Sequence, residues 1–161
     1  MILFKEVKDK EHITTVSEVA KKIQLAYFTP ITGEAQVLYM LHKFQSEETI
    51  QKQIKNGYIY ELVYKNDNLA GYFGVKREKE KLFLSKFYLD SDFRGQGIGR
   101  KMMDKVIELG KDLKAVYLTV NKQNSGPIAV YKNLGFNIVD SVVTNIGDGF
   151  VMDDYVMEKE L

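Results

Sequence analysis

Apolar residues spaced three or four positions apart predict helices in the first third of the chain. The first such stripe contains Ile13, Val16, Ala20, Ile23 and Tyr27. Pro30 is expected to end this helix, because proline removes a backbone donor and clashes with the preceding turn. The start of the helix could be capped by Thr15 with Glu18, as a capping box, or by Asp9.

A second helical region follows Pro30. Its apolar stripe contains Val37, Leu38, Leu41 and Phe44. Ser46, which precedes two glutamates, marks a fresh helix N-terminus, and Asn56-Gly57 is expected to close the region.

From Tyr58 onward the pattern is typical of strands. Tyr58–Tyr64, Leu69–Val75 and Leu82–Leu89 are rich in β-branched and aromatic residues, and short polar turns separate them. These runs predict consecutive antiparallel strands. Alternation over Ile2–Val7 predicts another strand at the start of the chain.

The helical period returns in the second half of the chain. Ile98–Ile107 predicts a helix, and the continuous apolar run Ala115–Val120 predicts a buried central strand. Ser125–Leu134 predicts a short helix, and Phe136–Val143 with Phe150–Met157 predicts a terminal hairpin. The order β-α-α-β-β-β-α-β-α-β-β indicates an α/β domain whose sheet mixes parallel and antiparallel pairs.

Composition narrows the function classes. The chain has 161 residues, 45% of them hydrophobic, and its 23 basic and 22 acidic side chains leave a net charge of +1. This balance disfavours a duplex nucleic-acid binder, which usually carries a clear basic excess. The absence of cysteine excludes a disulfide scaffold, a thiol nucleophile and a thiolate-bound metal. His12 and His42 lack the spacing of metal ligands, so no metal is expected.

The N-terminal sequence MILFKEVKDK lacks the apolar core of a secretory signal. No segment approaches the about 18 continuous apolar residues of a membrane-spanning helix. We therefore expect a cytoplasmic protein with no membrane partner.

The segment Arg94–Arg100, Arg-Gly-Gln-Gly-Ile-Gly-Arg, stands between a predicted strand and a predicted helix. Its alternating glycines allow backbone amides to approach a ligand, and the helix N-terminus adds a positive field, so the segment suits a pyrophosphate. It is not a P-loop, since Arg100 and Lys101 follow the third glycine, and Arg100 also breaks the dinucleotide fingerprint. A plain glycine-rich turn is the alternative interpretation.

A second group of polar residues follows the buried strand. Asn124 lies at its end and Tyr131 comes seven residues later, so two helical turns place both roughly on one side. Taken singly, Asn124 could be a helix cap and Tyr131 a core residue. Together with the glycine loop they indicate one site.

These residues resemble the GNAT superfamily of acetyl-CoA-dependent N-acetyltransferases, whose loop reads Gln/Arg-x-x-Gly-x-Gly/Ala. The superfamily also has a later Asn, a Tyr seven residues on, and a Gly-Phe pair. The matching residues here are Arg94, Gly97, Gly99, Asn124, Tyr131, Gly135 and Phe136. The element order fits along nearly the whole chain, with a looser likeness to bacterial spermidine/spermine acetyltransferase-like members.

The resemblance implies one N-acetyltransferase domain over residues 1–161 with the α/β GNAT fold. This fold has a mixed, largely antiparallel sheet of about seven strands with a splayed central pair, flanked by about four helices. Leu82–Leu89 and Ala115–Val120 would form the splayed pair. Acetyl-CoA is then the expected cosubstrate. Its implied binding residues are Phe87, Tyr88, Leu89, Arg94, Gly95, Gln96, Gly97, Ile98, Gly99, Arg100, Asn124 and Tyr131.

The resemblance also implies that Tyr131 is the general acid for the departing thiolate and that a backbone N–H near Leu89 stabilises the oxyanion. Transfer should be direct, because there is no cysteine to acylate. Many members carry a base glutamate on one of the splayed strands, where this chain has Phe83, Ser85, Lys86 and Thr119. The remaining candidates for the base are Glu61, Glu34, Asp90 and Asp154.

The acceptor in this superfamily lies between the first two helices and the terminal hairpin. The residues offered there are Tyr27, Phe28, Glu34, Tyr39, Asp148, Asp153 and Asp154. Of these, Tyr27, Phe28, Glu34 and Asp154 are the expected substrate-binding residues. Aromatic rings and carboxylates suit a cationic primary amine such as a polyamine. The alternatives are a protein N-terminus, as in ribosomal-protein alanine acetyltransferases, and a non-catalytic CoA-binding sensor. For the oligomeric state, a homodimer is one alternative and a monomer is the other.

Overall fold

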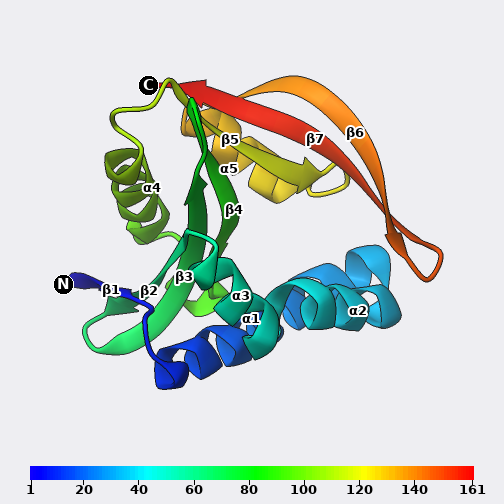
Figure 1. Ribbon diagram of the computed structural model, residues 1–161, viewed down its shortest axis with the longest axis horizontal. Helices are drawn as coiled ribbons and strands as arrows, with labels where there is room; N and C mark the ends of the chain where they lie inside the picture. Colours follow the sequence, from blue (N-terminus) through cyan, green and yellow to red (C-terminus); the bar gives the residue numbers. More distant parts are fainter.

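The structure is a computed structural model that describes residues 1–161 (Figure 1). Seven strands form one sheet in the order β1-β2-β3-β4-β5-β7-β6. The strands are β1 (Ile2–Glu6), β2 (Tyr58–Lys65), β3 (Asn68–Arg77), β4 (Lys81–Leu89), β5 (Ala115–Asn121), β6 (Asn137–Gly147) and β7 (Phe150–Glu160). The helices are α1 (Lys10–Thr32), α2 (Glu34–Gln45), α3 (Glu47–Lys55), α4 (Ile98–Leu109) and α5 (Ser125–Asn133), with a 3₁₀ turn, η1, at Ser91–Phe93.

The first helix begins at one of the two predicted caps and ends later than predicted. Asp9 is the N-cap, since its Oδ1 accepts a hydrogen bond from the His12 amide at 2.9 Å. The Thr15 hydroxyl instead donates to the Glu11 carbonyl, so the capping-box interpretation is wrong. Pro30 lies inside α1 and does not end it. A proline in the last turn removes only one hydrogen bond, and the Gly33 amide closes that turn by donating to Thr29 O.

The second predicted helical region is divided at Ser46, which gives five helices in all. The Ser46 hydroxyl accepts a hydrogen bond from the Thr49 amide and so caps α3, as predicted. Asn56 is the C-cap of α3, and Gly57 follows with a φ of 96°. The predicted close at Asn56-Gly57 is therefore confirmed.

The sheet agrees with the predicted mixture of strand directions. β2, β3 and β4 pair antiparallel in sequence order, and β5 lies between β4 and β7. The β4–β5 pair is parallel, and β5–β7 and β6–β7 are antiparallel. The hairpin curves away from the other strands until its turn lies beside α2 (Figure 1).

β4 contains a β-bulge at Ser85. Val75 of β3 faces Leu84 and the adjacent Gly74 faces Lys86, so Ser85 has no partner opposite it. An extra residue reverses the alternation of side chains beyond it. Leu84 before the bulge and Phe87 after it therefore pack in the same cluster, although they differ in parity.

The sheet separates two apolar clusters. One lies between the sheet and α4 and includes Phe73, Leu84 and Met102. The other lies between the sheet and α1–α3 and includes Tyr72 and Ala20. Neighbouring residues such as Tyr72 and Phe73 enter opposite clusters because a strand alternates its side chains. None of the helices is long and apolar enough to cross a lipid bilayer.

Candidate active site

The site begins where β4 and β5 part. The two strands pair only over Lys81–Phe83 and Ala115–Tyr117, and they diverge beyond these residues (Figure 1). A cavity of about 690 Å³ lies at the divergence. Its lining comes from β4, β5, the glycine loop and α5 on one side, and from α1, α2 and β7 on the other. The predicted splayed pair is therefore confirmed.

Phe87, Tyr88 and Leu89 line this cavity on the β4 side. β3 pairs with one edge of β4 along its length, whereas β5 covers the other edge only as far as Phe83. Backbone groups on the uncovered edge can therefore bind an extended ligand in the manner of an added strand.

The glycine loop forms an open groove at the N-terminus of α4. Gly95 and Gly97 have φ values of 75° and 79°, which glycine adopts without strain. At Gly95, Gly97 and Gly99 a Cβ atom would find no heavy atom within 4 Å. The first turn of a helix has unpaired backbone amides and the positive end of the helix dipole, and both stabilise a bound anion. The groove therefore has the chemistry of a phosphate site.

The other predicted loop residues divide into two groups. Arg94 and Ile98 line the cavity, and the Arg94 guanidinium lies 5.6 Å from the centre of the Tyr27 ring. Gln96 and Arg100 do not line it. The Gln96 side chain bonds to Lys65 and to the Asp92 carbonyl, so only the backbone of Gln96 can serve a ligand.

Asn124 and Tyr131 both line the cavity, as the resemblance implied. Asn124 occupies the N-cap position of α5, but its side chain makes no capping bond. Its Oδ1 is buried without a hydrogen-bond partner, which is costly unless a ligand donates to it. Tyr131 packs against the rings of Phe87 and Phe136, and burial raises the pKa of its hydroxyl.

Asp154 is the carboxylate of the cavity. It lies on β7 opposite Asn121 of β5, and only 5% of its surface is exposed. Burial raises the pKa of Asp154 to about 6, with a further contribution from Asp153 and an opposing one from Lys122. Its charge in turn contributes to the raised pKa of Tyr88, about 12, for which burial is the main cause.

The other base candidates lie outside the cavity. Glu61 is buried in β2, where desolvation raises its pKa. Asp90 forms an ion pair with Lys22 at 2.9 Å and caps η1, and the Lys22 hydrogen bond lowers its pKa. Glu34 is exposed at the first residue of α2. None of these three carboxylates lines the cavity, so Asp154 is the one base candidate that does.

The predicted acceptor residues also divide. Tyr27, Phe28 and Asp154 line the cavity, but Glu34 does not. The Tyr39 hydroxyl donates to the Ile146 carbonyl at 2.6 Å and thereby holds the hairpin. Asp148 lies in the hairpin turn and Asp153 pairs with Lys122.

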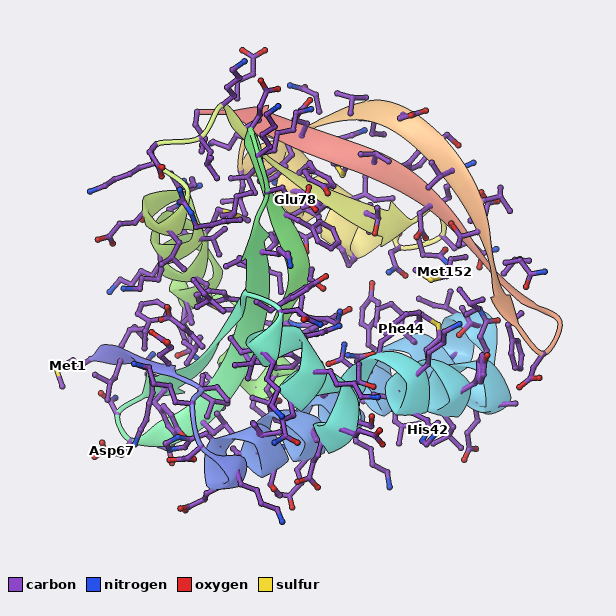
Figure 2. The ribbon with its side chains drawn as sticks, in the orientation of Figure 1. Met1, His42, Phe44, Asp67, Glu78 and Met152 are labelled. Carbon is purple, nitrogen blue, oxygen red and sulfur yellow. The ribbon has the colours of Figure 1, made fainter.

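Sequence reasoning missed several lining residues. Phe44 of α2 and Met152 of β7 lie on facing sides of the opening between the helices and the hairpin (Figure 2). Lys86, which departs from the family pattern on this strand, lines the cavity beside Ser85. No local signal marks a bulge in β4, so its orientation was not predictable from spacing.

Comparison with known proteins agrees with this geometry. The family model described as "Acetyltransferase (GNAT) family" matches residues 23–136. The spermine/spermidine N(1)-acetyltransferase of Bacillus subtilis is 29% identical over 84 residues, covering 50% of this chain and 51% of that protein. The [ribosomal protein bS18]-alanine N-acetyltransferase of Escherichia coli is 29% identical over 94 residues, covering 57% of this chain and 64% of that protein.

The chain thus spans about half to two thirds of the length of these two relatives. Among solved structures, the PaiA N-acetyltransferase of Thermoplasma acidophilum in complex with coenzyme A superposes with a TM-score of 0.82. That alignment covers 100% of this chain and 99% of the other, at 21% identity. It shows that the two proteins share a fold.

Proposed function

Because this chain belongs to the GNAT acetyltransferase family, we propose that it transfers an acetyl group from acetyl-CoA to a primary amine. The most direct support for this proposal is the divergence of strands β4 and β5 beside the glycine loop. It opens one cavity that holds the glycine-loop groove, a part-buried tyrosine and a buried carboxylate together.

The cavity residues fit acetyl-CoA. The open groove at Gly95, Gly97 and Gly99 suits the pyrophosphate, and the uncovered edge of β4 suits an extended pantetheine arm. The unpartnered Oδ1 of Asn124 can accept a hydrogen bond from an amide of that arm. Bound acetyl-CoA supplies an activated thioester carbonyl.

Two side chains move protons in this proposal. Asp154, whose pKa is about 6, is ionised at neutral pH and accepts a proton from the ammonium of the acceptor. Tyr131 keeps its proton at neutral pH because burial raises its pKa, and it donates that proton to the sulfur that leaves.

We propose a small amine with one cationic centre as the acceptor. Asp154 is the single carboxylate that lines the cavity, whereas Glu34, Asp148 and Asp153 lie outside it. A polyamine, which has several ammonium groups, would find one partner there. The likeness to the Bacillus subtilis relative supports a polyamine as an alternative acceptor. The likeness to the E. coli relative supports a protein N-terminus as another.

The test is release of free CoA from acetyl-CoA in the presence of an amine panel. The panel contains polyamines, aminoglycosides, amino acids and peptides with free N-termini. We expect release with at least one class, and Tyr131→Phe should lower kcat on the order of 10²–10⁴-fold. Calorimetry should show an acetyl-CoA Kd within about twofold of wild type, since the hydroxyl is removed and the ring is kept.

Tyr64→Phe is the matched control, because Tyr64 is a part-buried tyrosine of β2 outside the cavity. It should leave kcat unchanged. Tight acetyl-CoA binding without CoA release from any amine would instead identify a sensor. Equal losses of kcat and affinity in Tyr131→Phe would remove Tyr131 from the acid role.

A further inference from the structure

Lys86 is a cation inside the cavity without an anionic partner. Its Nζ donates to the Ser85 hydroxyl at 2.7 Å, and it takes part in none of the ion pairs of the protein. Desolvation alone lowers its pKa to about 8, and no carboxylate is near enough to raise it. Lys86 is partly buried, and partial desolvation of an ammonium without an anionic partner is unfavourable, so an anionic group of a ligand would stabilise it.

The bulge at Ser85 decides where Lys86 points. Beyond the bulge, Phe87 and Leu89 pack toward the α4 cluster, and Tyr88 packs toward the cluster under α1 and α2. Lys86 is two residues before Tyr88 and shares its face of the strand. The Tyr88 ring in turn contacts Phe28 of α1, with ring centres 6.3 Å apart. Lys86 therefore lies on the side of the sheet that faces the helices of the acceptor region.

Three carboxamides that line the cavity are already hydrogen-bonded within the protein. Gln24 donates to the Tyr72 hydroxyl, and that hydroxyl donates to Gln45. Gln53 accepts from the hydroxyl of Tyr60. These three carboxamides line the cavity but are held by buried tyrosines. The Ser85 hydroxyl remains the one protein partner of Lys86.

Asp154 and Lys86 are two separate charges of opposite sign in one cavity. They form no ion pair, and neither contributes to the pKa shift of the other. A ligand with an ammonium group and a carboxylate can satisfy both at once. The lining of the same cavity also includes apolar side chains, among them Phe28, Met40, Phe44 and Met152.

We propose that the acceptor is a zwitterionic amine, an amino acid with an apolar side chain, whose carboxylate binds Lys86 while its amine faces Asp154. This inference rests on the proposed acetyl transfer and names its substrate class. Lys86 is then the residue that selects the carboxylate, and the apolar lining receives the side chain.

The experiment compares three amines that share the isobutyl side chain of leucine: L-leucine, L-leucinamide and 3-methylbutylamine, with spermidine as a fourth probe. Each is assayed for CoA release with wild type, Lys86→Met and Lys86→Arg. We expect wild type to prefer leucine, and Lys86→Met to lower kcat/KM for leucine at least about tenfold, the size of one charge-assisted hydrogen bond. The two carboxylate-free amines should change less than about threefold.

Lys86→Arg should retain the preference for leucine because it retains the charge. The ratio of variant to wild type cancels the different basicities of the three amines. Lys55→Met is the matched control, since Lys55 is exposed on α3 and outside the cavity, and it should change nothing. Lys86→Met removes a partly desolvated charge and should therefore fold. If it does not fold, Lys86→Gln replaces it in the same assays.

Two results would overturn the inference while leaving acetyl transfer intact. One is equal or better use of 3-methylbutylamine or spermidine, and the other is an equal loss for all amines in Lys86→Met. A preference for succinyl-CoA over acetyl-CoA that Lys86→Met abolishes would assign the carboxylate to the donor and also overturn it.

If no amine releases CoA, the proposed function fails, and binding decides the inference separately. Calorimetry on the CoA-loaded protein should then show that L-leucine binds to wild type and about tenfold more weakly to Lys86→Met. No binding to wild type, or equal binding to both, overturns it.

Discussion

At the scale of single residues, burial acts on Asp154 and Tyr131 in the same direction with different consequences. It raises both pKa values, because a charged side chain loses its hydration in the cavity. Asp154 ends at about 6, close enough to neutrality to accept and return a proton. Tyr131 remains a neutral hydroxyl throughout the physiological range. Burial is thus the common cause of the protonation states on which the proposed base and the proposed acid depend.

Asp154→Asn tests the base. In wild type, kcat/KM should rise with pH through about 6 as Asp154 loses its proton. The variant should lose this acidic limb and fall on the order of 10²-fold or more in kcat/KM at pH 7.5. A pH profile of CoA release measures both effects. An unchanged acidic limb in Asp154→Asn would exclude this carboxylate as the titrating group.

The same substitution has a readout that does not depend on activity. The folded-state pKa of Asp154 lies above the usual value of 3.8, so the folded protein holds the proton more tightly than the unfolded chain. The free energy of unfolding therefore decreases as pH rises from about 4 to about 6. Asp154→Asn should remove this dependence and show a higher Tm than wild type at pH 8, with little difference at pH 4.

At the scale of elements, the start of α4 combines low helix propensity with an open surface. Gly97 precedes the helix in a left-handed conformation and Gly99 lies in its first turn. Glycine in a helix is less stable than alanine by about 0.5–1 kcal/mol. The open space at Gly99 means that a side chain would meet no protein atom. This cost in stability is explained if a ligand occupies that space.

Gly99→Ala should therefore stabilise the protein and weaken cofactor binding at the same time. We expect Tm to rise by about 2–4 °C, the usual effect of about 1 kcal/mol in a chain of this size. The acetyl-CoA Kd should increase, and Gly99→Asp should increase it further, about tenfold or more, by adding a negative charge at the pyrophosphate. Differential scanning fluorimetry and calorimetry measure the two quantities. Unaltered affinity in Gly99→Asp would refute the assignment of the loop.

At the scale of the whole molecule, the acceptor side of the cavity is assembled from segments far apart in the chain. The β6–β7 hairpin reaches α2 through the carbonyl of Ile146, which accepts from Tyr39 and from Lys43, both at 2.6 Å. Tyr39 and Phe150 also pack with ring centres 5.2 Å apart. These contacts hold Met152 opposite Phe44 (Figure 2) and so fix the width of the opening.

Tyr39→Phe should loosen this closure without reaching the cofactor groove. Loss of one hydrogen bond, worth about 0.5–1.5 kcal/mol, should raise the KM for the amine about 2–10-fold. The acetyl-CoA Kd should stay at the wild-type value, because α4 and its loop are untouched. Tyr117→Phe, which removes a hydrogen bond to Glu78 at a distant turn, is the control. A rise in the acetyl-CoA Kd in Tyr39→Phe would show that the hairpin also supports the groove.

The elements and the glycine loop could be predicted because their signals are local. The three- and four-residue stripe of α1, the alternation in β2–β4 and the cap at Ser46 each depend on residues a few positions apart. The pairing of Asn124 with Tyr131 across two helical turns is local as well. The helix end predicted at Pro30 was wrong, because the hydrogen bonds made after the proline, rather than the proline itself, decide where the helix ends.

Tertiary structure alone decided which charges reach the site. Glu34, Asp90 and Asp154 are equivalent carboxylates in the sequence, and only the fold buries Asp154 against the cavity, pairs Asp90 with Lys22 and leaves Glu34 in water. The orientation of Lys86 depends on a bulge defined by register against β3. Burial, register and desolvation are sums over neighbours distant in sequence, so the sequence by itself determined the elements and the loop, and the packing determined the chemistry of the acceptor side.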